Sequence, residues 1–367
     1  MRNSSSIILL LALLICILSV ISIFSSTYQR ETESWQNIYQ RQILWIVLGV
    51  ALFFTVSGIN YRRFWDWNYF LYISALLFLL LVLTLGSVRL GAQRWLRFGW
   101  FNFQPSELVK IVMVIFLARY YSLKNADNVS LLSEKFGFIR ALMLPLFFVA
   151  IPMGLIIEQP DLGTGLIILF LFISMAYLSN VKLRYILVLL GSILLFMPFA
   201  WHFLRDYQKD RLMVFLNPNI DPLGAGYTVI QSKIAIGSGG FWGKGWLSGT
   251  QSQLRFLPEA HTDFIFAAFS EEWGLLGGAV LLLLYYLLIR QGFLIAQRTR
   301  DHFGKLMAFG ISLLLSLQVM INIAMNMGFA PIVGIPLPLM SYGGSSMFVT
   351  FIALGILANI DKRRSVF

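Results

Sequence analysis

Cysteine, histidine and charge are all scarce in this sequence, and each shortage excludes a class of protein. The single cysteine, Cys16, allows no intrachain disulfide. The three histidines, His202, His261 and His302, are too far apart in the sequence to suggest a zinc site. Only 12% of the 367 residues are charged, whereas 58% are hydrophobic. No soluble domain buries so large an apolar fraction, so we expect a polytopic membrane protein.

The apolar residues fall into ten runs, and the segments between the runs are too apolar or too short for a soluble domain. We therefore predict an all-α fold with about ten transmembrane helices, forming a single membrane domain over residues 1–367. The predicted spans are residues 7–24, 42–57, 69–86, 105–120, 141–157, 162–178, 185–203, 264–289, 306–327 and 346–360.

Lys and Arg outnumber Asp and Glu by 28 to 17, which gives a net charge of +11. We expect no nucleic-acid partner, because the sequence has no basic helix and no aromatic box of the RNA-binding type. The charge instead suits loops that face anionic lipid and an anionic substrate. In the short loops, Lys and Arg concentrate on the side of the N-terminus, which predicts that both termini are cytoplasmic. The long loop 204–263 then faces outward.

The segment 87–110 on the outer side mixes arginines with aromatic residues. Aromatic rings at headgroup depth with snorkelling arginines, Arg94 among them, would form an interfacial belt. Pro105 suits the first position of the next helix. Glu107 and Lys110 then lie one turn apart on one face, where they form a local ion pair or serve function, since ionisable residues in membrane helices are functional candidates.

Three further outer segments have distinctive patterns. In the turn 158–165, Asp161 is placed to cap the following helix. In the long loop, residues 227–236 suit a short helix lying on the membrane. The glycines of 237–249 match neither the P-loop pattern nor the dinucleotide-binding pattern GxGxxG. They indicate a flexible loop that allows close backbone approach. The prolines of 328–346 forbid a regular helix, and irregular backbone at membrane depth must be buried in protein or line a cavity.

The longest polar stretch, Gln251 to Phe266, carries Glu259, His261 and Asp263 just before an apolar run. It belongs to a series of motifs that spans nearly the whole chain: GAQRWLRFG with FQPSELVK, EQPDLGTG, GYTVIQSKIAIGSGGFWGKG, LPEAHTDFIFAAFSEEWG and GIPLPLMSYGGSS. In this order they resemble the SEDS family of shape, elongation, division and sporulation proteins. The stretch before Asp263 and the short C-terminal tail are more similar to the elongation branch than to the division branch, while the sporulation branch stays open.

The resemblance implies an enzyme that polymerises lipid II into glycan strands at the outer face of the cytoplasmic membrane. The donor bond is α and the product bond is β, so a single inverting displacement is implied. That step needs a base for the acceptor hydroxyl and cationic groups for the diphosphate leaving group. The implied partners are a class B penicillin-binding protein and other membrane proteins of the elongation machinery.

Asp263 matches the essential outer-loop aspartate of the family, which implies that it is the base or the ligand of a divalent cation, magnesium or manganese. Alternatively, Asp263 merely occupies the first turn of a helix that Thr262 caps. Glu259 and His261 are second choices, and His261 fits better as a supporting group than as a base. The candidates for binding the diphosphate and sugars are Lys110, Arg94, Arg211, Lys233, Glu107, Asp161, Glu259, His261 and Gln251.

Two other functions fit a basic protein with ten helices. A lipid flippase or transporter would carry its charges through the membrane midplane, whereas here they gather in loops at one face. A scaffold that only activates its partner would leave Asp263 replaceable.

Overall fold

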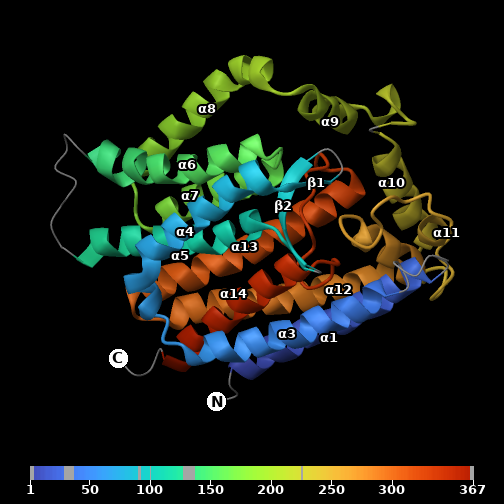
Figure 1. The fold of residues 1–367 in the computed structure, drawn as a ribbon, viewed down its shortest axis with the longest axis horizontal. Coiled ribbons are helices and arrows are strands. Elements are labelled where there is room, and N and C mark those ends of the chain that lie inside the picture. The colour runs from blue at the N-terminus through green and yellow to red at the C-terminus, as the bar shows by residue number, and fades with distance from the viewer. Residues whose placement is uncertain are drawn as a thin grey trace.

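The computed structural model describes residues 4–28, 37–89, 92–99, 101–126, 137–224 and 226–363. Long helices run side by side along one direction, and the first and last of them, α1 and α14, begin and end at the same end of the bundle (Figure 1). The long helices are α1 (Ser4–Thr27), α3 (Ile38–Gly58), α4 (Arg63–Leu85), α5 (Pro105–Ala126), α6 (Leu144–Glu158), α7 (Leu162–Leu178), α8 (Leu183–Phe203), α12 (Ile265–Arg298), α13 (His302–Met327) and α14 (Gly344–Arg363).

These helices confirm the all-α polytopic fold and account for all ten predicted spans. Seven are long and apolar enough to cross a membrane: α1, α3, α4, α12, α13, α14, and α6 together with the π-helical turn Ile139–Met143 that precedes it. The helix α7 and the apolar part of α8 are shorter. The remaining span is α5, whose apolar run is interrupted by Glu107, Lys110 and Arg119.

The predicted boundaries are least accurate at α4, α5 and α12. The helix α4 begins six residues before its predicted start, α5 ends six residues after its predicted end, and α12 continues to Arg298 instead of ending at residue 289. Hydropathy identifies the part of a helix that lies in hydrocarbon, and these helices extend beyond that part with polar and aromatic residues.

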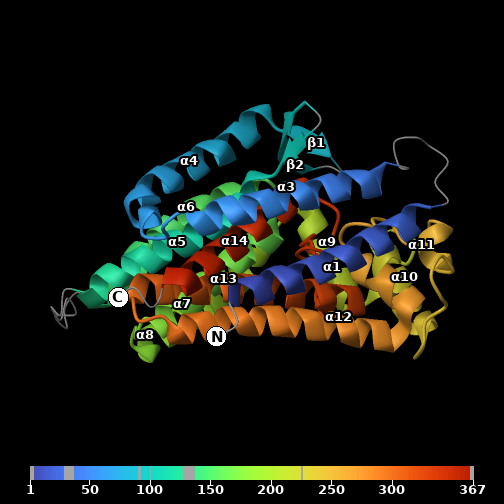
Figure 2. The same ribbon diagram turned by 90° about the horizontal axis from the view of Figure 1, so that it is seen from below.

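The helices are buried to very different degrees. Within the candidate span of α14, 89% of the residues are buried, against 28% in α4. The middle of α5 is also buried on all sides, from Val109 to Ala118. In contrast, α8 leans away from the other helices and exposes most of its apolar side chains (Figure 1). The centre of the bundle is therefore formed by α5, α13 and α14, and Figure 2 shows α13 and α14 between α4 and α12.

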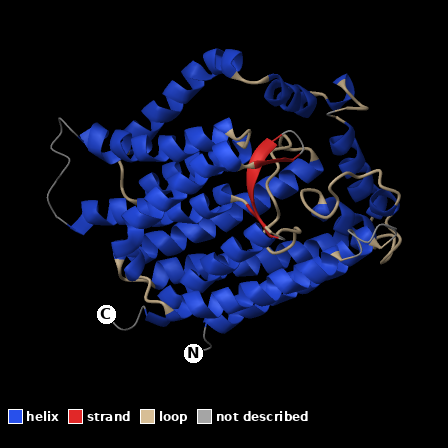
Figure 3. Ribbon diagram, in the orientation of Figure 1, coloured by secondary structure: helices blue, strands red, loops and turns tan. Residues whose placement is uncertain are grey.

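The segment predicted to form an interfacial belt is a small antiparallel sheet (Figure 3). Its strands β1 (Ser87–Arg89), β2 (Ala92–Phe98) and β3 (Phe101–Phe103) pair in sequence order. The ring of Phe101 packs against the rings of Trp45 and Phe348, at centroid distances of 5.2 and 5.5 Å. The aromatic ring therefore anchors the sheet to the bundle, and the depth of this segment in the membrane stays a prediction.

The long outer loop contains α9 (Asp206–Leu216), a 3-10 turn (Pro218–Ile220), α10 (Tyr227–Gly239) and α11 (Thr250–Gln253). It lies at the end of the bundle opposite the start of α1 and the end of α14 (Figure 1). The predicted short helix at 227–236 is confirmed as α10. It packs on α12 and α13, and its position on the membrane stays a prediction.

The glycine-rich segment after α10 fits against a break in α12. Gly274 has a φ of 63° and interrupts the helix. The amides of Lys244 and Gly245 donate to the carbonyls of Glu271 and Glu272, both at 3.0 Å. A Cβ at Gly243 would lie 2.1 Å from the Glu272 carbonyl oxygen. The predicted close backbone approach is therefore confirmed, and its role is to satisfy the polar groups that the break exposes.

Cysteine accessibility tests the predicted membrane orientation. With the buried Cys16 replaced by serine, we expect the Ser248→Cys variant to react with an impermeant thiol reagent in spheroplasts, because Ser248 is exposed in the outer loop. The Asn180→Cys variant, exposed between α7 and α8, should react only after permeabilisation. Ser130, another position on the inner side, lies outside the described residues. Labelling of Asn180→Cys alone in intact spheroplasts would reverse the topology.

Candidate active site

Asp263 lies in a tight turn that immediately precedes α12. Glu259 adopts a left-handed conformation with a φ of 49°, and its carbonyl accepts hydrogen bonds from the amides of Thr262 and Phe264 at 3.1 and 3.3 Å. The Thr262 hydroxyl donates to the Glu259 carboxylate at 2.9 Å. Phe264, which offers no capping side chain, is the residue before α12. The alternative in which Thr262 caps a helix that contains Asp263 is therefore wrong.

The irregular segment before α14 holds one side of this turn. The amide of Tyr342 donates to the carbonyl of His261 at 2.9 Å, and the Ser341 hydroxyl donates to the carbonyl of Thr262 at 2.6 Å. Ser341 in turn accepts from the amide of Leu337 at 2.8 Å. The proline-rich segment is thus buried against protein, as its non-helical sequence predicted.

Two asparagines of α13 hold the other side. Asn326 and Asn322 donate from their Nδ2 atoms to the carbonyl of Asp263 at 2.9 and 3.1 Å. Asn322 also donates to the carbonyl of Ile335 at 2.8 Å, and Asn326 accepts from the amide of Ala267 at 3.2 Å. Both side chains are fully buried. The sequence analysis missed them, although two amides four residues apart in an apolar run share one helix face.

The carboxylate of Asp263 is half-buried and lies within the field of four charged groups. Burial and then the charge of Glu259 raise the pKa of Asp263 from 3.8 to about 6, with a smaller contribution from Asp161, while Arg94 and Arg211 act in the opposite direction. Among the described residues, Asp263 has no ion pair within 4 Å. The site therefore holds a carboxylate that gains a proton near neutral pH.

Gly334 lies beside this carboxylate. Its φ is 69°, and a Cβ built on it would lie 3.6 Å from the Oδ2 atom of Asp263 and 3.9 Å from the Nη1 atom of Arg94. A side chain at this position would therefore contact both groups. The backbone at Gly334 thus approaches both the carboxylate and the guanidinium, while part of Asp263 stays exposed.

Arg94 is brought to the site by β2. Its Nε atom donates to the carbonyl of Gln159 at 2.9 Å, and its Nη2 atom donates to the carbonyl of Pro160. These bonds tie the sheet to the turn between α6 and α7. The Nη1 atom of Arg94 lies near Gly334.

Arg211 reaches the same site from α9. Burial, reinforced by Arg94, lowers the pKa of Arg211, and Tyr207, Asp263 and Asp161 oppose the shift. A guanidinium nonetheless stays charged in proteins. Beside it lies a small hollow of about 10 Å³ lined by Arg211, Val214, Phe215, Val229, Ala330, Pro331 and Ile332. A cation beside apolar side chains suits an anionic group attached to an apolar chain.

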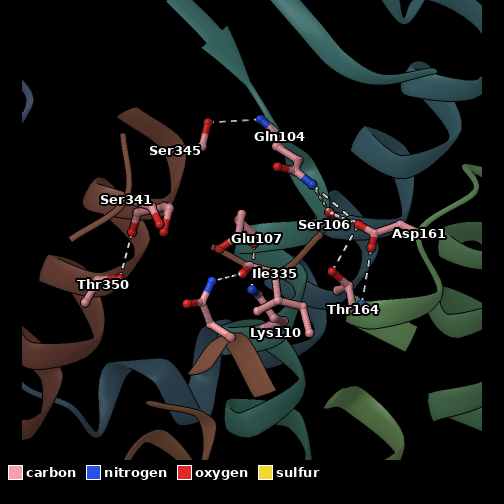
Figure 4. Close-up of polar contacts among 12 residues, drawn as sticks. Gln104, Ser106, Glu107, Lys110, Asp161, Thr164, Ile335, Ser341, Ser345 and Thr350 are labelled. Carbon is pink, nitrogen blue, oxygen red and sulfur yellow. Dashed lines mark hydrogen bonds and ion pairs between the residues drawn. The ribbon is translucent and has the colours of Figure 1, made fainter. Parts of the chain in front are cut away.

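Asp161 is buried, and its hydrogen bonds are internal. It caps α7 by accepting from the amide of Thr164 at 3.2 Å, which confirms the predicted cap. It also accepts from the hydroxyls of Thr164 and Ser106 at 3.0 and 3.1 Å and from the side-chain Nε2 atom of Gln104 at 3.4 Å (Figure 4). Asp161 therefore joins the start of α5 to the start of α7.

Lys110 and Glu107 form a buried ion pair. Their Nζ and Oε1 atoms are 2.6 Å apart, and the side chains are 1% and 3% exposed (Figure 4). The predicted one-turn pairing is confirmed. The structure places the pair inside the protein, where an ammonium is costly unless it is paired.

The other candidates lie elsewhere in the loop. Lys233 is exposed on α10 and packs over Gly328, at the end of α13. The amide of Gln251 donates to the Glu271 carboxylate at 3.0 Å. The ring of His261 is buried beside that of Tyr342, with centroids 5.9 Å apart. The structure therefore brings together Asp263, Glu259, Asp161, Arg94 and Arg211, but leaves Lys233 and Gln251 in other contacts.

A divalent cation is compatible with this set only if the substrate completes its coordination. Within the described ranges, no group of three or more His, Cys, Asp or Glu side chains forms a metal site. Asp263 and Glu259 offer two carboxylates that lie close enough for the charge of Glu259 to raise the pKa of Asp263. One or two carboxylates are what proteins commonly provide to Mg²⁺ when phosphate oxygens and water supply the remaining ligands.

Comparison with known proteins gives a consistent result. The chain is 42% identical to the peptidoglycan glycosyltransferase MrdB of Escherichia coli K12, over 98% of this chain and 93% of that protein. It is 33% identical to the peptidoglycan glycosyltransferase RodA of Treponema pallidum, over 97% of each. A chain solved in a study of a peptidoglycan synthase complex, which coordinates polymerization and crosslinking, superposes with a TM-score of 0.80 at 32% identity, covering 98% of this chain and 97% of that one.

The family model described as "Cell cycle protein", which covers FtsW, RodA and SpoVE, matches residues 4–366. This match extends over nearly the full chain and includes every segment that forms the site around Asp263. The chain belongs to the FtsW/RodA/SpoVE family, the SEDS family whose motifs its sequence carries.

Proposed function

We propose that this chain, a multi-pass peptidoglycan glycosyltransferase of the FtsW/RodA/SpoVE family, polymerises lipid II at the outer face of the cytoplasmic membrane during cell elongation, with Asp263 as the base. The observation that carries the proposal is the carboxylate of Asp263, which is only half-buried and whose pKa is raised to about 6 within the field of Arg94 and Arg211. A base works best when its pKa is near the operating pH, because it is then ionised and still accepts a proton readily.

In the proposed step, the 4-hydroxyl of one sugar attacks the anomeric carbon of another, and its proton passes to Asp263. The bond from that carbon to the undecaprenyl diphosphate oxygen breaks, so the electron pair leaves with the diphosphate and the configuration inverts. Arg94 and Arg211 lie where they can neutralise the leaving group, since guanidinium groups match phosphate geometry. The apolar side chains beside Arg211 suit contact with the adjoining polyprenyl chain.

A flippase remains the alternative, and the position of the charges favours the enzyme. The charged groups that act on Asp263 come from the sheet, the α6–α7 turn and the outer loop, at one end of the bundle. A translocation pathway would need such groups through the midplane.

The partner follows from the solved relative. That chain comes from a synthase complex in which polymerization and crosslinking are coordinated. We propose that this chain likewise binds a class B penicillin-binding protein, which would cross-link the new strands, together with other membrane proteins of the elongation machinery.

A divalent cation, Mg²⁺ or Mn²⁺, is the proposed cofactor. Asp263 and Glu259 would hold it, and when bound it would neutralise charge on the diphosphate. The remaining neutralisation would come from Arg94 and Arg211.

Replacing Asp263 by asparagine is expected to reduce polymerisation by about 10²–10⁴-fold, the usual effect of losing a base. The fold should persist, because the raised pKa of Asp263 means that its ionised form destabilises the protein, increasingly from about pH 4 up to about pH 6 and constantly above. The measurements are glycan synthesis from lipid II by purified protein and the melting temperature at pH 7.5.

Glu158→Gln is the matched control, since Glu158 is an exposed outer carboxylate paired with Arg205 at 2.7 Å. It should keep full activity. In the unmodified protein, kcat/KM should rise with pH through about 6, because the base must be ionised. Near-normal synthesis by Asp263→Asn would remove Asp263 from the mechanism.

The Lys110→Met variant is expected to lose about 3–5 kcal/mol of stability, because it leaves the Glu107 carboxylate buried and unpaired. The double variant Glu107→Gln with Lys110→Met should recover most of that stability. Glycan synthesis by the double variant then decides the role of Lys110: full activity means a structural pair, whereas a stable and inactive protein supports contact with the diphosphate. Arg205→Met, at the exposed pair, should cost under about 1 kcal/mol.

Removing divalent cations is expected to reduce polymerisation, and adding Mg²⁺ or Mn²⁺ should restore it. Glycan synthesis is measured in excess chelator and after titration with each ion, with melting temperature as the control for unfolding. Full activity in chelator, unchanged by added metal, would exclude the cation and leave Asp263 as base alone.

A further inference from the structure

Three successive carbonyls of the turn are held by donors from other elements. Those of His261 and Thr262 accept from Tyr342 and Ser341, and that of Asp263 accepts from two asparagine side chains. The bonds to Asp263 span 59 and 63 residues of sequence. The main chain at Asp263 is therefore fixed by α13 and by the segment before α14, while its carboxylate stays available.

Asn322 has a distinctive position within this arrangement. From one Nδ2 atom it donates to the carbonyls of Asp263 and Ile335, at 3.1 and 2.8 Å. Ile335 directly follows Gly334, whose Cα faces both the Asp263 carboxylate and Arg94. One buried amide thus joins the backbone at Asp263 to the backbone at Ile335, next to Gly334.

Asn326 supports the same carbonyl from one turn further along α13. It donates to Asp263 and accepts from the amide of Ala267, so it links the turn to the first turn of α12. Its Nδ2 atom also donates to the carbonyl and the Oδ1 atom of Asn322, at 2.8 and 3.3 Å. The two amides therefore orient one another, and the pair resists rotation of either side chain.

We propose that Asn322 is a positioning residue, which sets the distance between the Asp263 carboxylate and the backbone at Gly334 without touching the substrate. The proposal rests on the proposed role of Asp263 as base. Its physical basis is that a base must sit within hydrogen-bond reach of the proton that it accepts, and that a misplacement of about 1 Å can cost about 10²-fold in rate.

The test compares Asn322→Leu and Asn322→Asp with Asn359→Leu. Asn359 is an equally buried asparagine of α14, at the end of the bundle where that helix finishes, and it performs the same local task. Its Nδ2 atom donates to the carbonyl of Ser57 at 2.7 Å, and its Oδ1 atom accepts from the amide of Tyr61 at 2.9 Å. The matched substitution removes comparable bonds far from Asp263.

We expect both Asn322 variants to lower kcat by about 10–100-fold with little change in KM for lipid II. Asn359→Leu should lower the melting temperature by a similar amount and leave kcat per folded protein unchanged. Asn322→Asp keeps the volume of the side chain, so it provides a second measurement if the leucine variant does not fold. A kcat for both Asn322 variants equal to that of Asn359→Leu would overturn the proposal.

A double-variant comparison separates this inference from the proposed function. If Asn322 acts through Asp263, then Asn322→Leu should reduce kcat in the unmodified background but not in the Asp263→Asn background. An equal reduction in both backgrounds would mean that Asn322 has only a structural role. Full activity of Asp263→Asn alone would instead reject Asp263 as the base, whatever Asn322 does.

Discussion

Lipid cannot hydrogen-bond the backbone, so an irregular segment at membrane depth depends on donors and acceptors supplied by its neighbours. The turn at 259–264 and the segment at 328–343 are both irregular, and they satisfy one another with the help of α13. The break in α12 at Gly274 is satisfied in the same way by the glycine-rich segment. The geometry of the candidate site is therefore set by the need to pair these backbone groups at the outer end of the bundle.

Asp161 and Asp263 both lie at this end of the bundle, but their hydrogen bonding and burial differ. Asp161 accepts hydrogen bonds from Thr164, Ser106 and Gln104 and is buried, so its lone pairs are occupied by the fold. Asp263 is half-buried, and its carboxylate has no hydrogen bond within the described part of the chain. Its main chain is held in place instead. Of the two, only Asp263 combines a fixed backbone with a carboxylate that can accept a proton.

Local sequence patterns predicted the features that depend on neighbouring residues. Apolar runs predicted the ten spans, a spacing of three residues predicted the pair Glu107–Lys110, and Asp161 matched a helix cap. Contacts between distant segments could not be predicted this way. The sheet at 87–103 pairs residues whose composition resembles a membrane interface, and Arg94 contacts a turn 65 residues away. Asn322 and Asn326 were missed because their partner lies about sixty residues earlier, in another element.

The buried charges, like the irregular backbone, depend on partners supplied by their neighbours. Lys110 and Glu107 neutralise one another in the interior, so neither leaves an unpaired charge. Around Asp263 the compensation is incomplete: Glu259 and burial disfavour the carboxylate, and Arg94 and Arg211 compensate only in part. The Nε and Nη2 atoms of Arg94 donate to the carbonyls of Gln159 and Pro160, so fewer of its N–H groups are left to interact with Asp263. Because its negative charge is only partly neutralised, the carboxylate of Asp263 is stabilised by taking up a proton. A base near neutral pH requires this property.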